Sequence, residues 1–226
     1  MKTHNKSFFK FLFVLLFVTT SSFSITSSYA QTTNTTSLGI KGGLNLANFR
    51  GDDVKDAENR TAFNLGLVLN YSVAETFGIS LEADYSSLGA IDKGNKINFE
   101  GFQLGTGDRT DKLDYLRTSL LFNYYMGTNE MTIRPKLFVG PYLGFLLNSQ
   151  YKIEDGDYQD YSDNAFNKTD FGFAFGAGLH LKVAEKVWLV PDVRYNLGVT
   201  NVADAANISG RNGALSVNLA LTFPLN

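Results

Sequence analysis

The chain has 226 residues and no cysteine, with 20 Lys and Arg against 22 Asp and Glu. This length suits one sizeable domain, and the near-neutral charge argues against a nucleic-acid-binding surface. The lack of cysteine excludes disulfides, thiolate metal sites and cysteine catalysis.

The first 30 residues have the pattern of a secretory signal peptide. Three lysines precede the apolar run 11–18, and small residues at the −3 and −1 positions end in Ala30. A membrane anchor is the alternative, but it needs roughly 20 apolar residues, whereas this run has eight. We therefore predict a signal peptide at 1–30, cleavage near Ala30 and a short periplasmic lead at 31–37. The mature chain would carry 17 basic and 22 acidic residues, a net charge of −5, and one histidine, His180.

From residue 38 onward, apolar and polar residues alternate in about eight segments, and no helical period occurs. In one segment, Phe63, Leu65 and Leu67 share a face, and Asn64 and Gly66 share the other. This period of two is typical of β-strands with two different environments. The segments are 38–49, 61–73, 77–88, 113–126, 134–148, 169–183, 187–200 and 213–223.

The connections between these segments alternate in length. Those after the second, fourth and sixth are tight, whereas those after the other four are polar and run from about 11 to 24 residues. Short periplasmic turns and long extracellular loops are typical of outer-membrane barrels. We predict an all-β domain over 38–226, an eight-stranded antiparallel transmembrane up-and-down β-barrel with long loops around 89–112 and 149–168.

The stretch DFGFAFGAGLHLKV, residues 170–183, bears on which face of the barrel is polar. Its phenylalanines share one face, and Gly172, Gly176 and Gly178 share the other. A soluble lipocalin-type barrel, with its apolar face inward, is the alternative. Its exterior would carry Lys, Glu and Thr, but the polar face here is crowded with Gly, Ala, Ser and Asn, so we expect the glycines to face a narrow lumen. Aromatic residues near strand ends predict interfacial girdles: Tyr71, Tyr85, Tyr124, Tyr125, Trp188, Tyr195 and Phe223.

By the same alternation, ten ionisable residues should point into the lumen. An eight-stranded barrel is just wide enough for side chains to fill, and an unpaired charge there is costly, so we predict a structural ion network that plugs the lumen. A narrow porin-like channel is the alternative. The ten are Lys41, Glu82, Asp84, Arg117, Lys136, Asp170, His180, Lys182, Asp192 and Arg194.

We predict no catalytic, cofactor-binding or metal-binding residues. A lumenal His180 beside Asp170 would suggest a hydrolase, but no serine adjoins the histidine in sequence and the mature chain has no second histidine. We therefore expect that the protein is not an enzyme and that it needs no cofactor.

Five motifs, in order along the chain, resemble the PorT-like outer-membrane β-barrel family. They are GIKGGLN at 39–45, LDYL at 113–116, GPYLG at 140–144, DFG with GAGL at 170–179, and RYNLGVTN at 194–201. Two features depart from the family pattern: Arg117 and Ser119 replace its usual acidic residue and proline, and the chain ends on Asn226 instead of an aromatic residue. The resemblance implies the barrel fold and the outer membrane; some family members are linked to type IX protein secretion and gliding.

The function predicted from the sequence is a structural or interaction role through the extracellular loops. An accessory role in type IX-like protein secretion and a narrow channel are the alternatives. The expected partners are outer-membrane lipid, the barrel-assembly machinery during biogenesis, and surface or secretion partners that bind the loops 89–112 and 149–168; nucleic acid is not expected.

Overall fold

The protein is described by a computed structural model. It covers residues 35–51, 57–99, 102–128, 131–162, 165–203 and 210–225, with the backbone alone for 94–99 and 102–106. The predicted signal peptide, 1–30, and most of the predicted lead lie outside these residues. Within them, no helix is long and apolar enough to cross a membrane.

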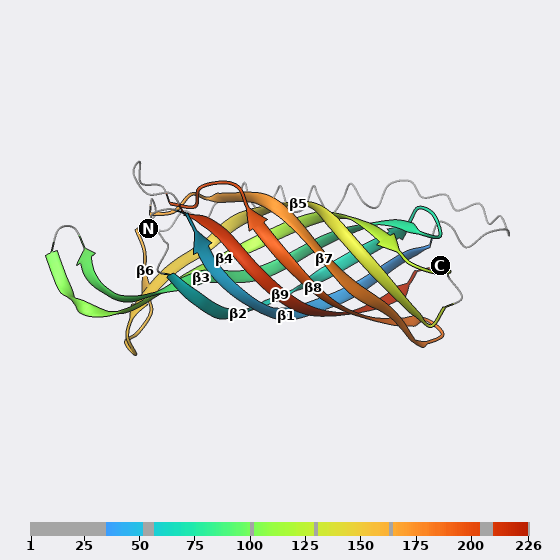
Figure 1. Ribbon diagram of the computed structural model, residues 1–226, viewed down its shortest axis with the longest axis horizontal. Helices are drawn as coiled ribbons and strands as arrows, with labels where there is room; N and C mark the ends of the chain where they lie inside the picture. Colours follow the sequence, from blue (N-terminus) through green and yellow to red (C-terminus); the bar gives the residue numbers. More distant parts are fainter. Residues whose placement is uncertain are drawn as a thin grey trace, which may run out of the picture. The chain divides into compact units, whose positions relative to one another are not determined.

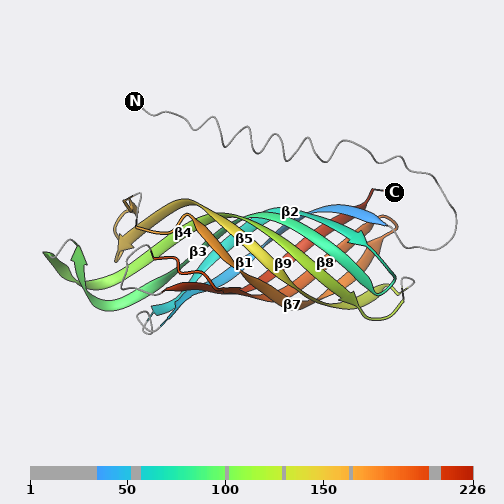
Figure 2. The same cartoon turned by 90° about the horizontal axis from the view of Figure 1, so that it is seen from above.

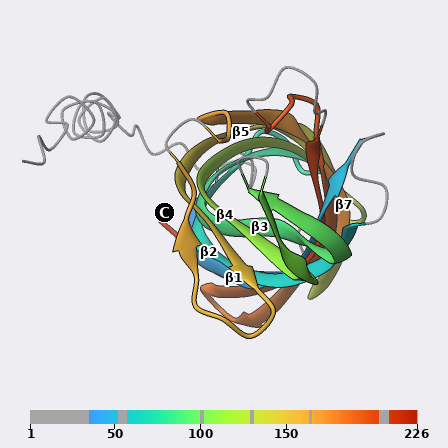
Figure 3. The same ribbon diagram turned by 90° about the vertical axis from the view of Figure 1, so that its left-hand side faces the viewer.

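The described residues form one antiparallel sheet that closes into an eight-stranded barrel, as predicted (Figures 1 and 3). The ring runs β1-β2-β3-β4-β5-β7-β8-β9 and back to β1, while β6 pairs only with β5 beside it. Closure pairs every strand on both sides, and this satisfies the backbone groups that lipid cannot. The strands are β1 (Thr36–Arg50), β2 (Ala57–Ser72), β3 (Phe77–Phe99), β4 (Phe102–Tyr125), β5 (Ile133–Ile153), β6 (Gln159–Asp160), β7 (Thr169–Ala184), β8 (Val187–Gly198) and β9 (Arg211–Pro224).

Both ends of the barrel sequence lie at one rim, because Ser37 of β1 pairs with Pro224 of β9. The connections β2–β3, β4–β5 and β7–β8 are at this same rim and have four, seven and two residues. We call it the turn rim, and the opposite end the loop rim.

The two faces of the sheet differ as the alternation predicts. On the outside, Leu44, Leu65 and Val217 are 59%, 62% and 58% exposed. Inside, Asn45 and Ser86 are fully buried. Apolar side chains that face outward all around a closed sheet fit lipid, whereas water would favour the reverse arrangement.

The glycines of β7 face the lumen, which confirms the prediction. A Cβ atom on Gly172 would lie 2.6 Å from the Tyr142 hydroxyl, and one on Gly176 would lie 2.7 Å from the Phe138 ring. Phe173 between them is 42% exposed on the outer face. Glycine therefore stands where large inward side chains of β5 need the space.

The prediction of a long loop at 89–112 is wrong. β3 continues to Phe99 and β4 begins at Phe102, so most of this segment is a β-hairpin (Figure 1). At 149–168, β5 likewise extends to Ile153, and β6 then pairs with its end. Both faces of β3 are buried from Ser86 to Ala90, so the alternation of exposed and buried residues stops there although backbone pairing continues.

Candidate functional site

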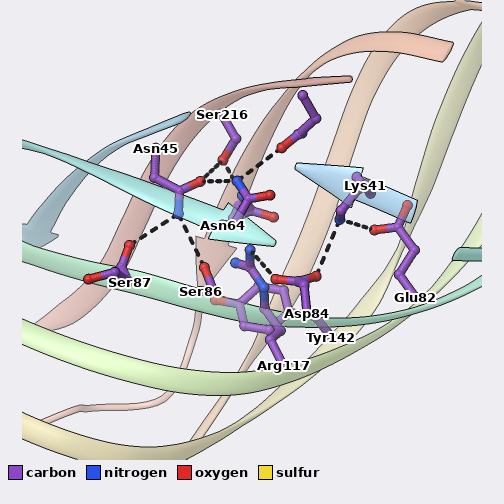
Figure 4. A network of polar contacts seen from close by, with 12 residues as sticks. Lys41, Asn45, Asn64, Glu82, Asp84, Ser86, Ser87, Arg117, Tyr142 and Ser216 are labelled. Carbon is purple, nitrogen blue, oxygen red and sulfur yellow. Dashed lines mark hydrogen bonds and ion pairs between the residues drawn. The ribbon is translucent and has the colours of Figure 1, made fainter. Parts of the chain in front are cut away.

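The polar interior of the barrel is centred on Lys41 of β1 and two carboxylates of β3 (Figure 4). The Lys41 ammonium lies 2.6 Å from Glu82 Oε2 and 3.2 Å from Asp84 Oδ1. All three residues are at most 3% exposed. Charges this deeply buried must pair, because desolvation of a lone charge is very costly.

Arg194 of β8 joins the same centre from the opposite wall. Its guanidinium donates two hydrogen bonds to Glu82, of 2.7 and 3.2 Å, and two to Asp192, each of 2.8 Å. β3 and β8 are separated by three strands in either direction around the ring. The Arg194–Glu82 pair therefore spans the lumen across its full width.

Arg117 of β4 closes the chain of ion pairs. Its guanidinium lies 3.3 Å from Asp84 and stands over the Tyr142 ring at 5.4 Å (Figure 4). The charged centre thus ties β1, β3, β4 and β8 together, with the Tyr142 ring of β5 against it.

Next to the charges lies a layer of amides and hydroxyls that sequence reasoning missed. Asn64 donates to Asn45 at 2.9 Å and to Asn218 at 3.0 Å, and Ser216 donates to Asn45 at 2.8 Å (Figure 4). Asn218 in turn donates to Asp192 at 2.8 Å, which joins this layer to the ion pairs. Their place on the inward face could have identified them, because they share the parity of the charged residues.

Asp170 lies apart from the cations, toward the loop rim. Its carboxylate accepts hydrogen bonds from Asn212 at 2.9 Å and from Tyr142 and Thr200 at 3.2 Å each. His180 is ten residues further along β7, roughly 33 Å at the rise of an extended strand. The two residues are therefore too far apart to form the acid–base pair that a hydrolase would need.

Three residues at the turn rim differ from the predictions. Lys182 is exposed, since it lies two residues before the end of β7, where the strand leaves the lumen. Tyr125 is 6% exposed and Trp188 stacks on His180 at 4.5 Å, so neither belongs to an outward girdle. Both point inward because they share the parity of the lumenal residues of their strands.

The structure therefore places eight of the ten predicted residues in the buried interior, His180 half-buried near the turn rim and Lys182 outside. Of these, Lys41, Glu82, Asp84, Arg117, Asp192 and Arg194 are joined by ion pairs. Among the described residues, no group of three or more His, Cys, Asp or Glu is placed to hold a metal ion. The interior is arranged to link strands across the barrel.

Comparison with known proteins agrees with this architecture. Residues 29–204 match the outer membrane protein beta-barrel domain family. The chain belongs to that family. Its members and its fold place it in the bacterial outer membrane. No curated protein matches the chain in sequence.

Two solved structures share the fold. A major outer membrane protein of Thermus thermophilus is 14% identical with a TM-score of 0.51, over 83% of this chain and 99% of that one. The solution structure of E. coli outer membrane protein W is also 14% identical, with a TM-score of 0.50, over 87% of this chain and all of that one. At this identity the likeness concerns the fold alone.

Proposed function

We propose that this outer-membrane barrel is a non-conducting scaffold that presents its β3–β4 hairpin to partners outside the cell. The observation that carries the proposal is the reach of that hairpin. β2 stops pairing with β3 at Asp92, and β5 stops pairing with β4 at Arg109. Beyond these residues, within the part of the chain that the structure describes, β3 and β4 pair only with each other, up to Phe99 and Phe102 (Figure 2).

The base of the hairpin is tied to its neighbour strand. The Lys93 ammonium lies 3.6 Å from Glu58 of β2 and 3.4 Å from Asp108 of β4. These exposed pairs add little stability but favour one orientation of the ribbon. A strand pair with two open edges offers unpaired backbone groups to a partner.

The interior supports the non-conducting part of the proposal. Arg194 and Glu82 meet in the middle of the lumen, and Lys41 and Asp192 complete the cluster. A conducting path would have to separate these pairs, at the cost of leaving buried charges uncompensated.

The proposal includes the steps that bring the protein to the membrane. These are removal of the signal peptide near Ala30, insertion by the barrel-assembly machinery, and membership of the PorT-like branch of the family. We further infer that the barrel is not an enzyme.

The plug can be tested by electrical recording. The purified full chain, inserted into planar lipid bilayers, should give no stepwise conductance. Regular conductance steps that disappear when the protein is omitted would contradict the plug and favour the narrow channel.

The hairpin can be tested by photo-crosslinking in living cells. A photoreactive amino acid at Lys93 should give an adduct with a second protein, and an otherwise identical chain with 94–106 replaced by a two-residue turn should lose it. The same amino acid at Lys186, at the turn rim, is the position control. Lack of an adduct at Lys93 would contradict the proposal, whereas adducts with secretion components would favour the secretion alternative.

A further inference from the structure

A small cavity lies in the lumen near the turn rim, next to the ion pairs of Lys41 and Glu82. Its volume is about 10 Å³, and its polar lining includes Lys41, Lys136, His180, Asp192 and Thr222. A volume of this size holds one water-sized particle. Phosphate, carboxylates and sugars are too large for it.

Lys136 of β5 lines this cavity, and no acidic side chain in the described part of the chain contacts its ammonium. Its side chain is buried, with 7% of the residue exposed. Among the described residues, its ammonium makes no hydrogen bond or ion pair, and it stands 5.1 Å from the centre of the Phe138 ring. The free energy of a desolvated ammonium falls strongly when an anion reaches it.

The carboxylates around the cavity are already paired with cations other than Lys136. Glu82 binds both Lys41 and Arg194, and Asp192 binds Arg194 and accepts from Asn218. Three cations, Lys41, Lys136 and Arg194, therefore surround the two acids Glu82 and Asp192. The neighbouring pair of Asp84 and Arg117 is balanced and adds no net charge. Asp170, another buried acid, is hydrogen-bonded toward the loop rim, so among the described residues one positive charge near the cavity has no acid in contact.

Two more polar groups face the cavity without partners. The Thr222 hydroxyl oxygen and His180 Nδ1 are both buried and make no hydrogen bond among the described residues. Thr222 is 1% exposed, so its hydroxyl has no alternative partner in bulk solvent. An ammonium, a hydroxyl and an imidazole nitrogen can all donate to one central acceptor.

We propose that this cavity binds one monatomic monovalent anion of chloride size, held by the Lys136 ammonium and the Thr222 hydroxyl. His180 completes the site in the tautomer that carries hydrogen on Nδ1. The cavity volume limits the occupant to a single small particle, and the lysine that lacks an acid in contact favours an anion. A water molecule would fit the same volume but would leave that charge uncompensated.

The direct test replaces chloride with bromide. Crystals of the full protein grown in sodium bromide should show an anomalous peak in hydrogen-bonding contact with Lys136, and crystals of Lys136→Met should lack it. Lys182→Met is the matched control, because it removes an exposed lysine of the same rim and should leave the peak unchanged. Ordered water without anomalous signal at this position would overturn the proposal.

Thermal unfolding gives a second readout that needs no crystals. At equal ionic strength, the unfolding midpoint should be higher in sodium chloride than in sodium gluconate, whose anion is too large for the cavity, and the difference should grow with the salt concentration. Lys136→Met should lose this difference and Lys182→Met should keep it. If Lys136→Met does not fold, Thr222→Val serves instead, since it removes only a hydroxyl and should reduce the difference. Equal midpoints in both salts would overturn the proposal.

Discussion

The barrel body and the hairpin beyond it are built from the same two strands, β3 and β4, under different constraints. In the body, Leu81 of β3 faces lipid and Glu82 faces the lumen, and both strand edges are paired. In the hairpin, beyond Asp92, the ladder within the described residues joins β3 and β4 only to each other. The difference shows that the backbone ladder forms in both environments, whereas the alternation in the sequence records only the contrast between lipid and lumen.

The largest expected contrast between the two regions concerns ion pairs. Glu82→Gln leaves Arg194 and Lys41 partly uncompensated in the lumen, and breaking a buried pair in this way costs about 3–5 kcal/mol. Lys93→Gln, at the base of the hairpin, removes exposed pairs and should not change stability measurably. Urea unfolding of both variants in lipid vesicles measures the difference. Equal effects would show that the interior pairs are as weak as those at the surface.

A second contrast compares the lipid belt with the loop rim. Leu219 is 50% exposed on the outer face of β9, and an arginine near the middle of the membrane costs about 2–4 kcal/mol. We therefore expect Leu219→Arg to lower the free energy of unfolding by that amount. Asp157→Arg, in the exposed segment between β5 and β6, should leave it unchanged. A tolerated Leu219→Arg would mean that this position lies at the edge of the belt or outside it.

A third contrast compares the two faces of one strand. Gly176→Val would put a Cβ atom 2.3 Å from the Val193 carbonyl oxygen, and overpacking of this kind costs about 1–3 kcal/mol. Ala177→Val adds similar bulk on the lipid side of the neighbouring position, where a branched residue suits a strand. Comparison of their unfolding midpoints tests whether lumen volume limits the side chains of β7. Equal tolerance of both changes would contradict that limit.

The smallest expected effect is a pH dependence at the loop rim. Asp111 lies on β4 beyond the lipid belt, where it accepts hydrogen bonds from Tyr161 and Arg109. Burial raises the pKa of Asp111 above its ordinary value of 3.8, although Arg109 acts in the opposite direction. A raised pKa means that the folded state binds more protons than the unfolded state between the two pKa values. The stability of this contact is therefore greatest below the unfolded value and falls as the pH rises through the folded one.

This dependence can be measured by hydrogen exchange at the Tyr161 amide, which donates to the Ser149 carbonyl. Its protection factor should fall in the natural protein as the pH rises above the ordinary pKa of 3.8, and Asp111→Asn should remove that fall. The amide of Leu146, which donates to the Lys168 carbonyl, serves as the internal reference. A fall that persists in Asp111→Asn would assign the titration to another group.

Parity along each strand was sufficient to predict the strands and which face of each is polar. Lys41 and Glu82 could be placed in the lumen in this way, because the inward direction repeats every second residue. Parity fails near a strand end, as at Lys182, and it carries no signal where both faces are buried, as at Ser86–Ala90. The pairing of Glu82 with Arg194 could not be predicted, since it depends on strand order and on the register of four intervening strand pairs.

The seam between β1 and β9 has a consequence for how the chain reaches its final state. It pairs Ser37 with Pro224, which are 187 positions apart in the sequence, and continues to the pair of Arg50 with Arg211. Contacts this distant form late, because a long loop must close first. Until the 14 residues of β9 are available, β1 and β8 each keep an open edge that lipid cannot satisfy. A chain that lacks β9 therefore has no stable membrane-inserted state, and insertion requires the last strand.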